Sequence, residues 1–129
     1  MAGALTLGFN PSYEATGAVT KQRFVKKTAA QTVILNDTDG GVCVGVAATS
    51  ISSTEATSGK STRVQAEGIA WVEAGAAVTV GAEVSSDNVG RGIASVTGKT
   101  VLGRAETGAS GAGVLFLVRL IPFGSGYVK

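Results

Sequence analysis

The stretch "TRVQAE", residues 62–67, has the clearest period-two pattern in the chain. Charged and amide side chains alternate with small or β-branched ones: Arg63, Gln65 and Glu67 against Thr62, Val64 and Ala66. This alternation is typical of a strand with one solvated face and one buried face. The stretch therefore predicts a half-buried β-strand.

Similar segments follow it along the chain. "IAWVEAG" and "AVTVGAEV" continue the pattern, with glycines at the breaks, and "TVLGRAE" and "GVLFLVRLI" come later. Turn signals recur about every 8–12 residues, as in β-sandwiches and barrels. The chain has 129 residues, of which 19 are Gly and only 16% are charged. We predict one all-β domain, a sandwich or barrel of short antiparallel strands.

The two ends of the chain differ from this middle part. Residues 1–30 show Gly, Pro and Thr breaks and little period, so we predict an extended N-terminal arm with a short strand around residues 23–26. Residues 31–121 form the predicted β domain, and residues 122–129 a short tail. We expect removal of residues 1–28 to leave the β domain folded.

The last predicted strand, residues 114–121, is apolar on both faces except at Arg119. It is either a central strand or one covered by a partner subunit. Trp71 alternates with Ile69, which favours a core or interface anchor over a sugar platform. The candidates for the core or an oligomer interface are Trp71, Val114, Phe116, Val118 and Phe123. Core packing is favoured for Val114, Phe116 and Val118.

Charge and cysteine content exclude several classes of protein. The net charge is +2 and most basic residues are scattered, which argues against nucleic acid as a partner. No apolar run approaches the roughly 20 residues of a membrane helix, and no signal peptide is present, so we expect a protein made in the host cytoplasm. Cys43 is the only cysteine, so we expect a buried apolar side chain and no disulfide or thiolate cluster.

Two Gly-Lys motifs suggest a phosphate-binding loop, at residues 59–61 and 98–100. That loop needs another glycine five residues before the Gly-Lys pair, where this chain has Thr54 and Ile93. Strand-like sequence follows both motifs, although the loop must open a helix. We predict tight turns instead, with a positive φ at Gly59 and Gly98 and solvated lysines.

Other catalytic and metal-binding patterns fit poorly. "NDTDGG", residues 36–41, lacks the acidic residues that an EF-hand requires at its later positions, and a hairpin turn explains its carboxylates. A looser calcium site shared with another loop stays open. The chain has no histidine, which removes His-dependent nucleophilic and metal sites. We predict no enzyme, cofactor or metal, while a nucleotidase using Lys60 or a carboxylate hydrolase stays a third reading.

The order of the motifs resembles a known family. The segments are residues 64–81, the pair Gly90-Arg91, residues 101–105 and residues 113–120, preceded by "GGVCVGVAATS". Together they resemble the small capsid decoration, or cement, proteins of tailed bacteriophages. The resemblance implies a β-sandwich or barrel on the outer surface of an HK97-type shell, often as a homotrimer. It also implies no catalytic residues.

The resemblance implies a virion structural protein that stabilises the shell by bridging neighbouring major capsid proteins. Aromatic and basic residues of the predicted arm are then candidates for capsid contact, or they pack on their own domain: Phe9, Tyr13, Arg23, Phe24, Lys26 and Lys27. The alternative is a carbohydrate- or receptor-binding β module of a virion, with "SISSTEATSG", residues 50–59, as the binding loop.

Overall fold

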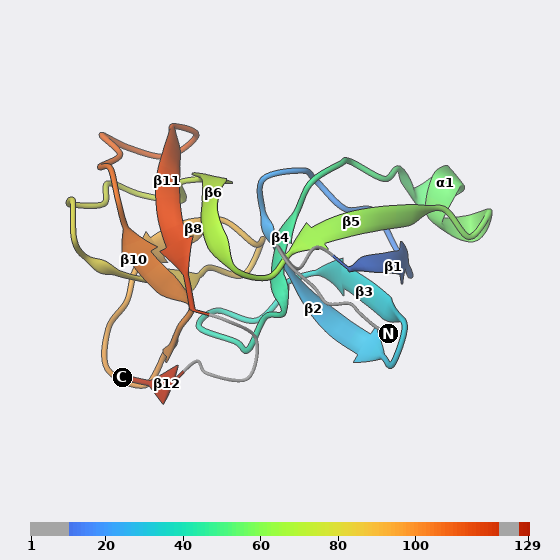
Figure 1. Cartoon of the computed structure of the whole chain (residues 1–129), viewed down its shortest axis with the longest axis horizontal. Helices are drawn as coiled ribbons and strands as arrows, with labels where there is room; N and C mark the ends of the chain where they lie inside the picture. Colours follow the sequence, from blue (N-terminus) through green and yellow to red (C-terminus); the bar gives the residue numbers. More distant parts are fainter. Residues whose placement is uncertain (1–10, 122–126) are drawn as a thin grey trace.

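The structure is a computed structural model that describes residues 11–121 and 127–129. Its strands gather into two lobes that lie side by side (Figure 1). The first lobe is a closed barrel with the strand order β1-β3-β2-β4-β5. Its strands are β1 (Ser12–Ala15), β2 (Phe24–Ala29), β3 (Thr32–Leu35), β4 (Gly45–Ala47) and β5 (Ser61–Gln65). The β1–β3 ladder is parallel, while the other ladders of the barrel are antiparallel.

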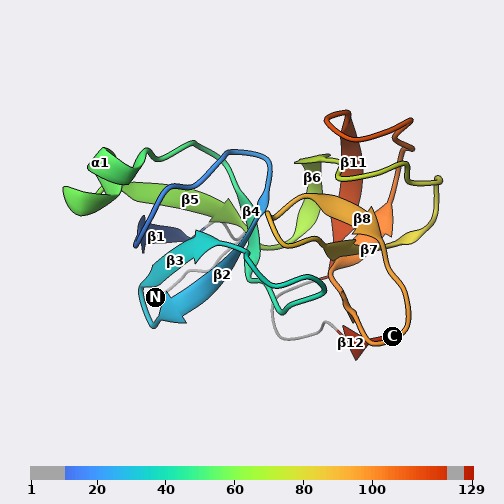
Figure 2. The same ribbon diagram turned by 180° about the vertical axis from the view of Figure 1, so that it is seen from behind.

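The second lobe is an antiparallel sheet with the strand order β6-β11-β10-β7-β8. Its strands are β6 (Gly68–Glu73), β7 (Glu83–Ser86), β8 (Gly92–Ala94), β10 (Gly103–Ala105) and β11 (Leu115–Leu120). A parallel bridge between Ala74 and Gly92 joins its two ends, so the sheet curls back on itself. Figures 1 and 2 show β6 and β11 on one face of this lobe and β7 and β8 on the opposite face.

Each lobe has its own apolar core, and β2 contributes to both. The barrel is filled mainly by Val and Ala side chains, including fully buried Val25, Val33 and Val64. Small side chains suit the narrow interior of a small barrel. The neighbouring residue Phe24 points the other way and belongs to the core of the second lobe, together with Phe116. Because successive side chains of a strand point to opposite faces, β2 joins the two lobes.

The alternation at residues 62–67 is confirmed. Thr62, Val64 and Ala66 are buried, whereas Arg63 and Glu67 are exposed. The stretch forms β5 and the turn into β6, so it connects the two lobes. The prediction of an all-β fold is also confirmed, although the described residues include a short helix that the pattern did not predict.

That helix, α1 (Ser53–Thr57), lies at the end of the barrel away from the second lobe (Figure 1). Ser52 caps it: the Ser52 side chain accepts a bond from the Glu55 N–H, and the Glu55 carboxylate accepts one from the Ser52 N–H. This capping box was readable as Ser-x-x-Glu in the Ser/Thr-rich stretch. The predicted binding loop, residues 50–59, therefore contains a regular helix that projects from the barrel, and none of the helix residues is buried.

The described part of the predicted N-terminal arm, residues 11–30, is not an arm. β1 and β2 belong to it, and both are strands of the closed barrel. The boundary at residue 30 is therefore corrected: the barrel begins at β1. The predicted strand around residues 23–26 corresponds to β2. β1 is held between β3 and β5 by non-local pairing. A short strand with an irregular sequence carries no local signal for such pairing, so sequence analysis did not predict it.

The end of the chain also pairs with the fold. β12 (Tyr127–Val128) forms a two-stranded ribbon with β9 (Thr100–Val101). The predicted tail, residues 122–129, thus includes a strand. Residues 122–126, with the candidate Phe123, lie outside the described residues.

Both Gly-Lys motifs are tight turns, as predicted. Gly59 has a φ of 80° and Gly98 a φ of 93°, a left-handed conformation that favours glycine. Gly59 follows α1 and leads into β5, whereas Gly98 leads into β9, so neither motif opens a helix.

Candidate functional site

The predicted contact residues that the structure describes do not form one exposed patch. Phe24 is 1% exposed and fills the core of the second lobe, so it is not available to a partner surface. This corrects its assignment as a contact candidate. Tyr13 packs partly against the barrel core, and the Lys27 ammonium lies 5.5 Å from the centroid of its ring. Phe9 lies outside the described residues.

Arg23 and Lys26 make ion pairs within the chain. The Arg23 guanidinium binds both carboxylate oxygens of Glu73, at 3.0 and 3.2 Å. The Lys26 ammonium binds Asp37, and this bond holds the pKa of the Asp37 carboxyl below its usual range. Arg23 therefore joins the two lobes, and Lys26 joins β2 to the turn after β3.

The outer face of β6 and β11 carries the candidates that are exposed. Trp71 on β6 is 52% exposed and lies opposite Leu117 of β11. Ile69 and Leu115 are also exposed on this face, each at 42%. We call Ile69, Trp71, Leu115 and Leu117 the β6–β11 face. Polar residues usually cover the outer face of a sheet, so these large apolar side chains make the β6–β11 face the candidate site for contact with a partner.

The intervening residues of these strands point inward. Phe116 and Val118 are fully buried, as expected for core residues. β11 lies between β6 and β10, so it is a central strand of its sheet. Val114 precedes it and is 38% exposed, so the core assignment of Val114 is corrected. Trp71 is likewise not a core residue.

A groove borders the β6–β11 face where β6 meets the barrel. It has a volume of about 180 Å³ and is lined by Gln22, Val46, Ala47, Ala48, Gln65, Ala70 and Trp71. Five of its lining residues have apolar side chains, and Gln22 and Gln65 carry amide groups. We call it the Trp71 groove. Sequence reasoning missed it because its lining residues come from both lobes.

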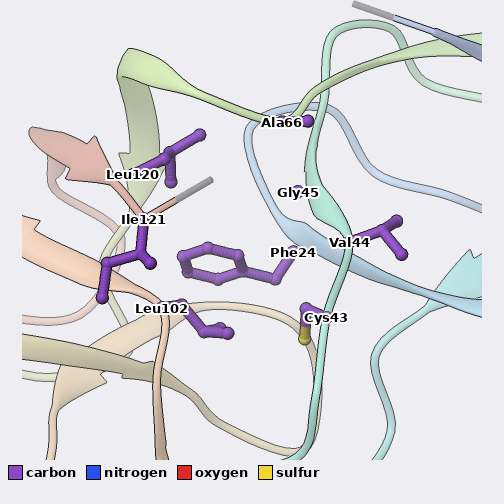
Figure 3. A pocket seen from close by; sticks show the side chains of 8 residues that line it. All are labelled: Phe24, Cys43, Val44, Gly45, Ala66, Leu102, Leu120 and Ile121. Carbon is purple, nitrogen blue, oxygen red and sulfur yellow. The ribbon is translucent and has the colours of Figure 1, made fainter. Parts of the chain in front are cut away.

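A second, smaller cavity lies where the two cores meet (Figure 3). Its volume is about 20 Å³, which is space for a single water molecule and not for a substrate. Phe24, Cys43, Leu102 and Leu120 are among its lining residues. Burial raises the pKa of the Cys43 thiol to about 12, so the thiol is protonated at neutral pH and is a poor nucleophile or metal ligand.

The carboxylates of the turn after β3 are paired with lysines. Asp37 binds Lys26, and Asp39 binds the Lys99 ammonium at 2.9 Å. Within residues 11–121 and 127–129, no three His, Cys, Asp or Glu side chains are grouped closely enough to hold a metal ion. Lys99 thus belongs to a turn–turn contact rather than to a fully solvated turn. Lys60 is more exposed and pairs with Glu55 at 3.3 Å.

Glu83 is the centre of a polar cluster beside the C-terminal strand. Its carboxylate accepts a hydrogen bond from the Tyr127 hydroxyl and pairs with the Lys129 ammonium at 3.0 Å. These bonds, led by the one from Tyr127, lower the pKa of the Glu83 carboxyl. The cluster fastens β12 to the second lobe.

Among the described segments of the chain, no helix is long and apolar enough to cross a membrane.

The described residues form a small β protein whose candidate site is an exposed apolar face. Residues 9–120 match the family profile described as phage cement protein. The chain therefore belongs to the phage cement protein family, which makes it a capsid-binding structural protein of the phage virion. The predicted family is confirmed.

The fold has a counterpart among solved structures. It is similar to the crystal structure of the head fibre gp8.5 N base of bacteriophage phi29, with a TM-score of 0.69 and 18% sequence identity. The match covers 88% of this chain and 93% of the other. At this identity the similarity establishes the all-β fold. A search of curated proteins finds no match.

Proposed function

We propose that the chain decorates the outer surface of an HK97-type phage shell and stabilises it by bridging neighbouring major capsid proteins. The observation that carries this proposal is the family match over residues 9–120. Binding to the assembled shell stabilises it by mass action, because the shell must lose these contacts before it opens. Several contact surfaces per oligomer add avidity.

The proposed oligomer is a homotrimer that associates through the β6–β11 face. Ile69, Trp71 and Leu115 are each at least 42% exposed, although they lie on regular strands of the second lobe. Large aromatic and aliphatic side chains of this kind are common anchors at interfaces. A second copy that covers them removes apolar surface from water.

Light scattering tests the oligomer. Leu115→Arg places a charge in the β6–β11 face, and we expect its mass to fall to that of a monomer. Val80→Arg is the matched control, because Val80 is 64% exposed in a loop outside this face. We expect Val80→Arg to keep the mass of the unmodified chain. Equal masses for both variants would contradict the assigned interface.

Co-sedimentation with expanded phage shells stripped of decoration tests the function. We expect saturable binding that raises the temperature at which the shells disrupt. Absence of binding at micromolar concentration would overturn the proposal.

We also infer that the chain works by binding and not by catalysis. The Cys43 thiol is buried with a raised pKa, and the lysines of both Gly-Lys turns pair with carboxylates. Lys60→Ala should therefore leave shell binding unchanged. Nucleotide hydrolysis by the unmodified chain that is lost in this variant would contradict the inference.

The similarity to a head fibre base favours a second candidate, a receptor- or carbohydrate-binding module on the virion. The exposed projection at α1, with the preceding residues 50–52, is the surface proposed for it. Glycan-array binding that is lost when this projection is shortened would support this candidate. Shell binding without glycan binding would contradict it.

A further inference from the structure

We propose that the Trp71 groove is a binding site for a sugar that carries a carboxylate. This goes beyond the proposed function, because it concerns the chain alone and requires no capsid. The site also differs from the α1 projection, which lies at the end of the barrel away from the second lobe (Figure 1). The proposed contacts come from one aromatic ring, two amides and two cations: Trp71, Gln22, Gln65, Lys21 and Arg63.

Trp71 gives the groove an exposed aromatic wall. It is 52% exposed, and Val46 and Ala70 lie beside it in the lining. The face of an indole ring is electron-rich, so it attracts the C–H groups on the apolar face of a sugar ring. The groove volume of about 180 Å³ is below the usual range of about 300–1,000 Å³ for small-molecule pockets, so it suits a single ring. The groove lies on the barrel side of Trp71, whereas Leu115 and Leu117 lie on its other side, on β11.

Gln22 is held in a strained conformation beside this groove. Its φ of 65° is left-handed, which is costly for a residue with a Cβ, and it is the one described residue other than glycine with a positive φ. Two backbone bonds fix it: the Gln22 N–H donates to the Ala47 carbonyl, and the Gln22 carbonyl accepts from the Glu73 N–H, each at 2.8 Å. Strain of this kind is found mainly at functional sites. Gln22 lines the groove, and its side-chain amide has no hydrogen-bond partner among the residues that the structure describes, so the amide is available to a ligand.

The second amide is oriented by the turn into β6. Gln65 Nε2 donates to the carbonyls of Glu67 and Ile69, at 3.1 and 2.9 Å. These two bonds use both N–H groups of the amide, so Oε1 remains to accept a hydrogen bond. The groove thus offers donors and an acceptor at Gln22 and an oriented acceptor at Gln65. Sugar hydroxyls both donate and accept, so they suit this pair of amides.

A peptide fits the groove less well than a sugar. The bond from Gln65 Nε2 to the Ile69 carbonyl and the bond from the Glu73 N–H to the Gln22 carbonyl occupy the edge of β6 on both sides of Trp71. Strand addition needs free main-chain groups along such an edge. A compact ligand that is held by side chains alone is therefore favoured.

Two exposed cations lie at the rim of the groove. Lys21 precedes Gln22. Arg63 lies two residues before Gln65 on β5, so the side chains of both point to the same face. The Arg63 carbonyl also accepts a bond at 2.8 Å from the N–H of Ala48, which lines the groove. Among the residues that the structure describes, neither cation pairs with a carboxylate.

Nearby carboxylates compensate this charge only in part. Glu73 is already paired with Arg23. The Glu14 carboxylate, on neighbouring β1, lies near Gly59 at the α1 end of the barrel. Glu67, in the turn into β6, leaves one carboxylate against two cations. An anionic ligand supplies the missing charge, and an arginine guanidinium binds a carboxylate by two parallel bonds.

Titration of the Trp71 fluorescence tests the proposal, because Trp71 is the only tryptophan in the chain. The probes are glucuronate, its neutral counterpart glucose, and a short peptide of glutamate and leucine. Light scattering of the same samples checks that the mass of the protein stays constant. We expect glucuronate to change the emission saturably at millimolar concentration and glucose to bind roughly tenfold more weakly. No saturable change with glucuronate, or equal affinity for both sugars, would overturn the proposal. A response to the peptide alone would overturn it in favour of an acidic protein partner.

Arg63→Gln tests the charge at the rim. We expect it to lower the affinity for glucuronate roughly tenfold and to leave the affinity for glucose unchanged. Arg104→Gln is the matched control, because the Arg104 side chain is 60% exposed on β10 of the second lobe. It should bind glucuronate as the unmodified chain does. Equal losses from the two variants would show a general effect of net charge and contradict the assigned site.

Gln22→Gly separates a binding role of Gln22 from a structural one. Glycine adopts a positive φ at little cost, so we expect the melting temperature to stay the same or to rise. The same variant should bind both sugars several-fold more weakly, because the groove loses an amide. Unchanged sugar binding by this variant would overturn the assignment of Gln22. Shell co-sedimentation of the same proteins is scored separately, so failure here is distinguishable from failure of the proposed function.

Discussion

Arg23 of the barrel and Glu73 of the second lobe form a two-point ion pair, with Nε 3.0 Å from Oε1 and Nη2 3.2 Å from Oε2. Gln22, the preceding residue, accepts a backbone bond from Glu73, and the following residue, Phe24, enters the core of the second lobe. Three consecutive residues thus fasten the lobes by a main-chain bond, an ion pair and an apolar contact.

The Arg23–Glu73 pair should contribute to stability. Both side chains are less than a quarter exposed, at 22% and 23%, so water screens the pair only in part. We expect Glu73→Gln to lower the free energy of unfolding by about 1–3 kcal/mol, the usual effect of a bond to a charged group. Urea unfolding measures it. Glu106→Gln breaks the more exposed pair with Arg119 and should cost less than about 1 kcal/mol. A larger effect for Glu106 would contradict this ranking.

The N-terminal strands should be required for folding. Deleting residues 1–28 removes β1 and most of β2, so the barrel loses its closure and β3 loses both neighbours. We expect this truncation to abolish cooperative unfolding of the barrel, contrary to the sequence-based expectation that it stays folded. Circular dichroism and thermal melting measure it, with deletion of residues 2–8 as the control. A truncated chain that melts cooperatively like the control would show that the barrel does not need these strands.

Neighbouring residues of β11 should differ sharply in their effect on stability. Phe116 is fully buried, whereas Leu115 is 42% exposed. We expect Phe116→Ala to lower the free energy of unfolding by about 3–5 kcal/mol, because it leaves a cavity. We expect Leu115→Ala to change it by less than about 1 kcal/mol in the monomer. Similar losses from both substitutions would show that the two faces are assigned incorrectly.

Stability should fall in acid partly through Glu83. Its pKa is lower in the folded chain than in the unfolded chain, because Tyr127 and Lys129 bind the carboxylate. Its contribution is therefore present above the unfolded pKa of about 4.3 and is lost as the pH falls through the lower folded value. We expect Glu83→Gln to flatten part of the decrease in melting temperature below pH of about 4.3. Asp37 and Glu55 shift in the same direction, so part of the decrease should remain. An unchanged acid profile would exclude Glu83 as a contributor.

Cys43 should react slowly with thiol reagents. Burial raises its pKa to about 12, and the thiolate is the reactive form. We expect a disulfide reagent at pH 8 to label Cys43 only as fast as the chain opens, with rapid labelling in urea. Immediate labelling of the folded chain would show that the thiol is accessible.

Local patterns in the sequence determined the strand type, the turns and the family. The alternation at residues 62–67 specifies which side chains of β5 are buried, because the side-chain period of a strand is two. Glycine at positions 59 and 98 specifies tight turns, because only glycine adopts a positive φ at little cost. The capping box at Ser52 was equally local, and a search for it would have found α1.

Tertiary structure decided which strands meet and which apolar side chains remain outside. Phe24 and Trp71 are both aromatic residues in strand-like sequence, yet one is 1% exposed and the other 52%. The difference depends on which face of β2 and of β6 meets the other lobe, and alternation within a strand does not say which face that is. The Trp71 groove likewise exists only because residues 22, 46–48 and 65 pack beside residues 70–71. Residues far apart in the sequence meet in this groove because of long-range strand pairing. Local sequence patterns do not predict which distant residues will pair.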